Sequence, residues 1–382
     1  MTEHDGTSPV IVVGGGASGL SSAAALAHLG IESVVLDQDE TIGGTWKRRY
    51  RSLRLHTIRR FSGLACYPIP RQHAQYLSKD QYAAYLQEYA KALELDVSLG
   101  ERVHKVQRLD GTGKDSSWEL LTSQRRRRAR CVIMATGLYA KPYMPTWPGS
   151  DAFAGEILHS SQYDAADAYQ GRSVLVIGLG NSGAEIAADL ASHGAGSVSV
   201  SVRTAPPIVT REMFGIVPVQ LFGIALTPIG IPNVIDRCTA ALRRVSIGDL
   251  TEYGLGKAAW GPFTARRPAV IDTGFLRQLK QKRITIRPGI DHFDSASVVY
   301  KDQSRDAVDV VIAATGFRTG LDKILAVSSV IDKAGHPRPD LTIESDAPGL
   351  YFVGFDETVR GQLFEINRQS RQVAAEVKDY LG

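Results

Sequence analysis

The stretch that decides the fold is Val10-Ile11-Val12-Val13-Gly14-Gly15-Gly16-Ala17-Ser18-Gly19. Four apolar residues predict a strand buried on both faces, and residues 17–29 predict a helix that ends at Gly30. Between them, Gly14, Gly16 and Gly19 fit G-x-G-x-x-G, which allows a tight turn, close approach of a pyrophosphate and close helix–strand packing. A second strand ends at Asp37, whose carboxylate can bond ribose hydroxyls. The stretch, with Ser18 at the start of its helix, therefore predicts a nucleotide-binding βαβ unit with phosphate at the helix N-terminus.

The second half of the chain repeats this plan. An apolar strand at residues 173–177 precedes Gly178-Leu179-Gly180-Asn181-Ser182-Gly183, and a helix and another strand follow. In each half a later apolar strand ends in Ala-Thr-Gly, at Thr136-Gly137 and at Thr315-Gly316. We expect these two threonine–glycine pairs to mark where the chain crosses between domains, close to the cofactors. The repeat predicts two dinucleotide-binding domains.

The strand-end position of the second copy carries Arg203 instead of an acid. A guanidinium group binds a 2′-phosphate with a fork of donors, which a carboxylate would repel. Arg203, assisted by Thr204 and Arg211, therefore predicts NADPH rather than NADH at this site. The alternative is that Arg203 is a solvated surface charge.

Two nucleotide sites in one chain indicate one tightly held cofactor and one exchanged cofactor, which suits a flavin reduced by NADPH. We predict an α/β fold of two Rossmann-like domains, like that of the two-domain flavoproteins related to glutathione reductase. The last strand and helix are too few to form a domain, so we assign residues 1–150 and 315–382 to FAD binding. Residues 151–314 form an inserted NADPH-binding domain with a helical insert at about 206–262.

Composition excludes several other classes. Lys and Arg total 44 against 40 for Asp and Glu, so the net charge is 44 − 40 = +4, too balanced for a generic nucleic-acid binder. Five arginines at 125–128 and 130 are expected at an exposed hairpin end. The three cysteines lack the C-x-x-C spacing of a disulfide reductase and favour a reducing, cytoplasmic setting. No signal peptide is visible in the first residues.

Residues 213–235 carry no charge but contain three prolines. We interpret them as a buried or interface-lining helical insert, with membrane contact as the alternative. The expected partners are a small-molecule substrate and O₂, and no nucleic acid. The chain is expected to be a monomer or a homodimer.

Residues 153–164, Phe-Ala-Gly-Glu-Ile-Leu-His-Ser-Ser-Gln-Tyr-Asp, match F-x-G-x-x-x-H-x-x-x-Y-D. This motif, with the strings 43–47, 52–56, 210–215 and 349–355, resembles class B flavin monooxygenases across essentially the whole chain. Within that group the closest likeness is to YUCCA-type enzymes, which decarboxylate indole-3-pyruvate. The resemblance implies FAD and NADPH, a C4a-(hydro)peroxyflavin and insertion of one oxygen atom into a small organic substrate.

The preferred substrate is a 2-oxo acid such as indole-3-pyruvate. The alternatives are N- or S-oxygenation of a small metabolite, Baeyer–Villiger oxidation of a ketone, and an NADPH oxidase that makes H₂O₂.

The resemblance also implies roles for individual residues. His56, His159 and Gln362 are the candidate catalytic residues, and Gly44, Thr45 and Trp46 are expected to contact the flavin. The basic stretch at 47–60, in a region without acids from 41 to 79, is expected either to attract an anionic substrate or to form a solvated face. We predict no metal site.

Overall fold

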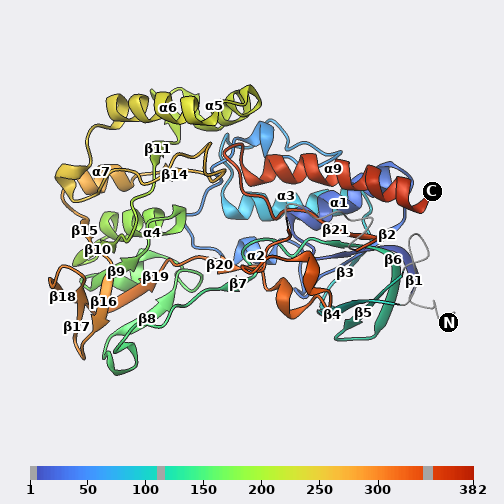
Figure 1. The fold of residues 1–382 in the computed structure, drawn as a ribbon, viewed down its shortest axis with the longest axis horizontal. Coiled ribbons are helices and arrows are strands. Elements are labelled where there is room, and N and C mark those ends of the chain that lie inside the picture. Colours follow the sequence, from blue (N-terminus) through green and yellow to red (C-terminus); the bar gives the residue numbers. More distant parts are fainter. Residues whose placement is uncertain (1–6, 110–116, 339–346) are drawn as a thin grey trace.

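Two sheets, one in each half of the molecule, form the framework of the fold, the first mixed and the second parallel (Figure 1). The computed structural model describes residues 7–109, 117–338 and 347–382. The first sheet has the order β3-β2-β1-β6-β5-β4, and β21 also pairs with β6. Its strands are β1 (Thr7–Val13), β2 (Ser33–Leu36), β3 (Val97–Ser98), β4 (Val103–Arg108), β5 (Trp118–Thr122), β6 (Arg126–Met134) and β21 (Leu350–Phe352).

Each face of the first sheet is covered by a different layer. Along β1, Val10 and Val12 pack on the side of helices α1 (Ala17–His28) and α9 (Gln362–Leu381). Ile11 and Val13 pack on the other side, against residues 321–330. Successive side chains of a strand point to opposite faces, so a strand covered on both faces must be apolar throughout. The structure confirms this prediction for the strand that precedes the first glycine loop.

The second sheet repeats the arrangement with the order β15-β10-β9-β19-β8. Along β9, Val174 and Val176 pack with α4 and α7, whereas Leu175 and Ile177 face a small antiparallel sheet. The elements of this lobe are β8 (Glu156–His159), β9 (Ser173–Ile177), α4 (Asn181–Ser192), β10 (Ser197–Ser201), α7 (Phe275–Lys280), β15 (Thr285–Arg287), β16 (Ile290–Phe293), β17 (Ser297–Tyr300), β18 (Arg305–Ala307) and β19 (Val310–Ala313).

Shorter elements connect the lobes and extend the second one. An antiparallel pair of strands, β7 (Lys141–Pro142) and β20 (Phe317–Arg318), lies where the chain crosses between the sheets. The remaining elements are α2 (Gly44–Lys47), α3 (Lys79–Ala92), β11 (Ile208–Thr210), β12 (Glu212–Met213), β13 (Val217–Pro218), α5 (Val219–Leu226), α6 (Pro232–Ile247), β14 (Val270–Asp272), and the 3₁₀ turns η1 (Arg59–Phe61), η3 (Ser150–Ala152), η4 (Ala166–Tyr169), η5 (Thr227–Ile229), η6 (Thr251–Tyr253), η7 (Leu321–Lys323) and η8 (Ser328–Val330).

The end of the chain returns to the first lobe. Strand β21 runs parallel to β6, and α9 lies alongside α1 (Figure 1). The hydroxyl groups of Ser21 on α1 and Ser370 on α9 are 2.7 Å apart and buried. The N-terminal nucleotide-binding unit is therefore completed by residues more than 300 positions away in the sequence.

The arginine run near residue 125 is less exposed than the sequence suggested. Strand β6 begins at Arg126, so Arg127 points inward, is 7% exposed and pairs with the buried Glu101 at 2.6 Å. Alternation along the strand leaves Arg126 and Arg128 on the outer face. The prediction of an exposed hairpin end is wrong for Arg127, because the strand starts earlier than expected.

The uncharged segment 213–235 is buried in part and exposed in part. On α5, Gln220 and Gly223 are buried, and Gln220 bonds the backbone of Ile58 and Arg360 in the first lobe. Six other large apolar residues are more than a third exposed: Phe214, Ile216, Val217, Ile229, Ile231 and Val234. The interface-lining part of the prediction is therefore confirmed for α5, but the segment as a whole is not buried. Within the described residues, no helix is both long and apolar enough to cross a membrane.

Candidate functional site

The two glycine-rich loops have the same local geometry. Gly14 and Gly178 have φ of +111° and +99°, values that L side chains rarely adopt. A Cβ atom on Gly14 would lie 2.7 Å from the carbonyl oxygen of Ala135, and one on Gly178 would lie 2.8 Å from that of Ala314. Each loop therefore turns tightly against the Ala-Thr-Gly strand end of its own lobe, and the internal repeat in the sequence is a repeat in space.

Of the other loop glycines, some allow close packing of the helix and others border open space. A Cβ atom on Gly19 or Gly183 would lie within about 2 Å of the carbonyl oxygen of Gly14 or Gly178, so these residues let the helix pack closely. Gly16 and Gly180, the residues that precede α1 and α4, have no atom within 4 Å of the corresponding Cβ position. Both helix N-termini thus face open space bordered by free N–H groups, as a pyrophosphate requires. The loops fit the two nucleotides predicted for them.

The strand ends provide further open or unsatisfied groups. The hydroxyl oxygen of Thr136 is buried without a hydrogen-bond partner among the described residues, and Gly137 beside it has open space at its Cβ position. A buried hydroxyl normally has a partner, so Thr136 fits contact with a bound flavin nucleotide. In the second lobe, Thr315 donates to the carbonyl of Tyr143, and only Gly316 has open space.

The residues at the two strand ends differ in environment. The carboxylate of Asp37 accepts hydrogen bonds from the backbone N–H groups of Gly15 and Asp39. Burial raises the pKa of Asp37 above its usual value, although these bonds oppose the shift. Arg203 and Thr204 are exposed, and the Arg203 side chain flanks Gly289. One strand end carries a partly buried acceptor, Asp37, and the other carries an exposed cation, Arg203.

The predicted flavin-contacting segment forms the short helix α2. Gly44 lies against the side chain of Asp39, and the Thr45 hydroxyl donates to Asp39 at 3.4 Å. The Trp46 ring packs edge-on against Tyr82 at 4.7 Å. The flavin contacts predicted for these residues stay predictions.

His56 contacts Glu185, an acidic residue that was not among the candidate site residues. Glu185 on α4 is 8% exposed, and its two carboxylate oxygens contact the Tyr50 hydroxyl and the Nε2 atom of His56. Tyr50 and His56 belong to the first lobe and Glu185 to the second. A sequence signal existed, because Glu185 and Asp189 are acids one helical turn apart in an otherwise apolar helix.

His159 ties the end of β8 to the crossing strands. Its Nε2 donates to the carbonyl oxygen of Gly316 at 2.9 Å, while Nδ1 accepts from the backbone N–H of Ser161 at 3.1 Å. Burial lowers the pKa of His159, which keeps the ring neutral at pH 7. Its ring lies edge-on to Phe317, over which the partly buried guanidinium of Arg49 lies at 5.2 Å. His159 therefore holds the crossover between the lobes.

The rest of the F-x-G-x-x-x-H-x-x-x-Y-D motif also connects the lobes. The Tyr163 ring lies 6.2 Å from the Tyr50 ring of the first lobe, and its hydroxyl donates to Asp189 on α4 of its own lobe at 2.6 Å. Asp164 forms an ion pair with Arg51 of the first lobe at 3.1 Å, and Arg51 also pairs with Asp167. The motif thus clamps residues 50–56 against the second lobe.

A cavity of about 280 Å³ lies between the lobes beside α4. Ser52 and Arg54 come from the first lobe, and Glu185, Asp189, Arg211 and Arg277 are among the lining residues of the second. The Arg211 guanidinium lies 4.1 Å from the centre of the Tyr76 ring. In the part of the chain that the structure describes, no side chain forms a hydrogen bond or ion pair with Arg54, Arg211 or Arg277. The two lining carboxylates, Glu185 and Asp189, bond tyrosine and histidine side chains instead. The three arginines therefore remain available to an anion.

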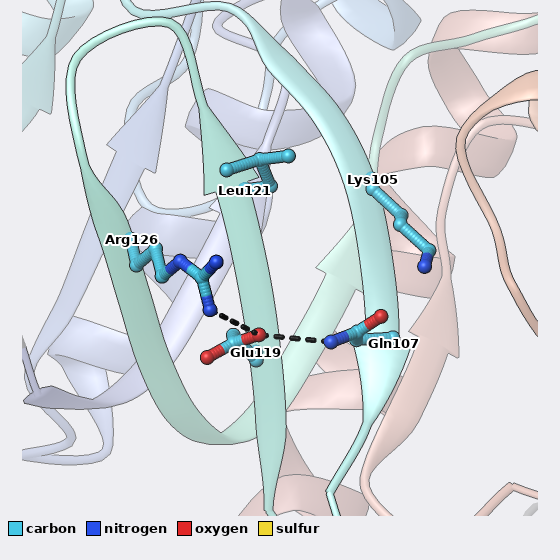
Figure 2. Close-up of a pocket in the computed structure, with 5 residues that line it drawn as sticks. All are labelled: Lys105, Gln107, Glu119, Leu121 and Arg126. Carbon is cyan, nitrogen blue, oxygen red and sulfur yellow. Dashed lines mark hydrogen bonds and ion pairs between the residues drawn. The ribbon is translucent and has the colours of Figure 1, made fainter.

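A second, smaller cavity lies on the outer face of strands β4, β5 and β6 (Figure 2). Glu119 at its centre accepts a hydrogen bond from Gln107 at 2.8 Å and forms an ion pair with Arg126 at 3.7 Å. Glu119 thus already has partners within the cavity, which includes neither glycine loop. We do not treat it as a functional site.

Gln362 begins α9, and its amide donates to the carbonyl oxygen of Gly354 at 3.3 Å. A role for Gln362 beside the flavin stays a prediction. Among the described residues, no group of three or more His, Cys, Asp or Glu side chains is placed to hold a metal ion.

Comparison with known proteins places these features in one family. Residues 7–322 match the model of the flavin-binding monooxygenase-like family. The chain is 33% identical over 364 residues to indole-3-pyruvate monooxygenase YUCCA1 of Oryza sativa subsp. japonica, covering 92% of this chain and 87% of that protein. It is 31% identical over 377 residues to indole-3-pyruvate monooxygenase YUCCA6 of Arabidopsis thaliana, covering 93% and 86%.

Solved structures show the same fold at lower identity. A flavin-containing monooxygenase from Stenotrophomonas maltophilia superposes with a TM-score of 0.74 at 23% identity, covering 98% of this chain and 99% of that one. A steroid monooxygenase bound to NADP superposes with a TM-score of 0.75 at 18% identity, covering 97% and 85%.

Two nucleotide loops, a clamped lobe interface and these similarities define a flavin-dependent monooxygenase that uses FAD and NADPH. The chain belongs to the flavin-binding monooxygenase-like family.

Proposed function

We propose that the enzyme inserts one oxygen atom into a 2-oxo acid such as indole-3-pyruvate, with oxidative decarboxylation. The observation that carries this proposal is the interlobe cavity, where Arg54, Arg211 and Arg277 lack ion-pair partners among the described side chains. A substrate carboxylate supplies the missing anion, because guanidinium groups bind carboxylates with paired hydrogen bonds. The similarity to indole-3-pyruvate monooxygenases supports the same choice.

The proposal also assigns one cofactor to each lobe. Residues 1–150 and 315–382 hold FAD, with Gly16 and Ser18 at the phosphates, Asp37 at the ribose and Thr136 near the flavin. Residues 151–314 hold NADPH, with Gly180, Asn181 and Ser182 at the phosphates and Arg203 at the 2′-phosphate. Asn181 already holds β14 in place by accepting from the N–H of Ile271 at 2.8 Å, so its side chain also shapes the loop.

When bound, the flavin supplies the redox chemistry that consumes NADPH and O₂ and delivers one oxygen atom. The residues of the chain bind, orient and exclude water. Arg54, Arg211 and Arg277 orient the substrate carboxylate. The contacts of His159 with Gly316 and of Asp164 with Arg51 join the two lobes. His56 lies beside Glu185, one of the residues that line the cavity.

Substituting the cavity arginines tests this proposal. Because a hydrogen bond to a charged group contributes about 1.5–3 kcal/mol, Arg54→Gln or Arg277→Gln should raise KM for indole-3-pyruvate about tenfold or more. KM for NADPH should stay nearly unchanged. Arg128→Gln, which removes an exposed arginine from β6, is the control for lost charge. If neither cavity variant changes KM for the 2-oxo acid, the substrate assignment is wrong.

The alternatives differ in what the enzyme consumes and makes. An amine or sulfide oxygenase would turn over an uncharged or cationic substrate with the cavity arginines removed. A Baeyer–Villiger enzyme would convert a ketone without loss of CO₂. An NADPH oxidase would return all of the consumed O₂ as H₂O₂. A cytoplasmic location and a monomeric or homodimeric state stay predictions.

A further inference from the structure

Glu185 is a buried carboxylate held between the two lobes. It lies on the second turn of α4, is 8% exposed, and has no basic partner among the described residues except His56. One oxygen contacts the Tyr50 hydroxyl and the other contacts His56 Nε2. Burial of a carboxylate is costly unless both oxygens find donors. The two donors come from residues 50–56, so this contact joins the predicted FAD-binding and NADPH-binding halves.

The direction of the hydrogen bond between Tyr50 and Glu185 is fixed. Burial, with the nearby Glu185 charge, raises the pKa of Tyr50 well above its usual value. The phenol therefore stays protonated and donates to Glu185. An ionised carboxylate can only accept hydrogen bonds, so the bond with His56 must also be donated to it.

These hydrogen bonds determine which of the two ring nitrogens of His56 carries the proton. If Nε2–H donates to Glu185, a neutral ring must leave Nδ1 without a proton, as an acceptor. Among the described residues, none forms a hydrogen bond with Nδ1, and the His56 side chain is 22% exposed. Nδ1 is thus the nitrogen that remains available to a bound molecule.

We propose that Glu185 is a positioning residue that fixes His56 as the Nε2–H tautomer, so that Nδ1 accepts a hydrogen bond or a proton from the substrate. A proton that reaches Nδ1 gives an imidazolium that donates from Nε2 to Glu185, and it returns to solvent through Nδ1 after the product leaves. The proton role rests on the proposed function. The tautomer assignment stands independently of it, because it depends only on the contacts of Glu185.

The chain offers a matched control one helical turn away. Asp189 is also a largely buried carboxylate of α4, and it too contacts a tyrosine and a histidine. Its tyrosine is Tyr163, and its histidine is His193, which is on the same lobe and 59% exposed. Asp189→Asn therefore removes the same charge from the same helix without touching His56.

The tautomer is measured by ¹⁵N–¹H NMR of the FAD-loaded, ¹⁵N-histidine-labelled protein, with His56→Gln to assign the signal. The wild-type spectrum should show protonated Nε2 and unprotonated Nδ1 at pH 7.5, and this result needs no variant to fold. Glu185→Gln should give a mixture of tautomers or the Nδ1–H form, because an amide can donate as well as accept. Asp189→Asn should leave the His56 signal unchanged. A wild-type Nδ1–H signal, or a Glu185→Gln spectrum equal to wild type, overturns the proposal.

Activity supplies the second readout. In Glu185→Gln, where His56 has the wrong tautomer, kcat for indole-3-pyruvate should fall about a hundredfold, because general acid–base catalysis contributes on this scale. KM should change little. Glu185→Asp should recover part of the rate. If wild type shows the expected tautomer but oxidises no 2-oxo acid, the proposed function fails while the positioning role of Glu185 stands. A normal rate in Glu185→Gln with an altered tautomer contradicts the proton role.

Discussion

The two lobes share one backbone plan and differ at the residue that each presents to a nucleotide. Both have a positive-φ glycine against an Ala-Thr-Gly strand end, an open glycine at a helix start and a third glycine that admits the helix. At the end of the second strand, however, the first lobe has the partly buried acceptor Asp37 and the second has the exposed cation Arg203. The duplicated fold therefore provides a phosphate site in each lobe, and a single side chain decides which nucleotide each lobe prefers.

The open glycines test whether the lobes bind separate cofactors. A Cβ atom at position 16 or 180 has no atom within 4 Å outside the adjacent backbone, so the fold should tolerate a valine there. Its side chain would occupy the phosphate space. We expect Gly16→Val to lower the flavin content about tenfold or more, measured by absorbance. Gly180→Val should keep its flavin but lose reduction by NADPH. Loss of flavin in both variants would contradict the assignment of one nucleotide to each lobe.

The strand-end arginine tests the choice of nicotinamide cofactor. Removing a guanidinium that binds a 2′-phosphate costs about 1.5–3 kcal/mol, so Arg203→Ala should raise KM for NADPH about 10- to 100-fold. KM for NADH, which lacks that phosphate, should change little. Steady-state kinetics with both cofactors make the measurement, and equal effects on the two would refute recognition of the 2′-phosphate by Arg203.

The smallest expected effect concerns two ion pairs that occupy different environments. Glu101 of the first lobe is fully buried, whereas Arg287 and Asp306 of the second are 32% and 16% exposed. Burial alone would raise the pKa of Glu101, but hydrogen bonds from Arg127, Ser98 and Thr122 outweigh it and lower the pKa to about 2. This stabilisation is present above the unfolded value of about 4.5 and is lost as the pH falls toward 2.

Thermal unfolding between pH 5 and pH 3 checks this expectation. The wild-type protein should lose stability on the order of 1–3 kcal/mol more than Glu101→Gln over the acid range. Asp306→Asn should show a smaller difference, because solvent screens the more exposed pair. Identical acid profiles for wild type and Glu101→Gln would show that the buried pair adds nothing.

Much of the fold was predictable because the signals were local. The apolar strand before Gly14, the helix that follows it and the apolar strand at 173–177 each depend on residues close in sequence, and all are confirmed. The inward turn of Arg127 was missed because the start of β6 depends on pairing with β5 rather than on its own sequence. The exposed apolar residues after Met213 were missed because hydrophobicity alone does not say which side of a helix finds a neighbour.

The candidate site was predicted in its parts but not in its connections. The glycine loops and His56 carry recognisable motifs, and the family is confirmed. Glu185 had no motif of its own, and its importance appears only when α4 meets residues 50–56 across the lobe interface. His159 was expected near the chemistry, yet its contacts with Gly316 and Ser161 place it at the crossover. Long-range contacts of this kind have no sequence period, so single-sequence patterns do not report them.

The central claim is that NADPH oxidation is coupled to oxygenation of a 2-oxo acid. The most direct test is the ratio of CO₂ and indole-3-acetate formed to NADPH consumed, with H₂O₂ measured in the same reaction. We predict a ratio near one with indole-3-pyruvate and little H₂O₂. A ratio near zero, with H₂O₂ equal to the NADPH consumed or with product formed only from an amine, sulfide or ketone, would contradict it.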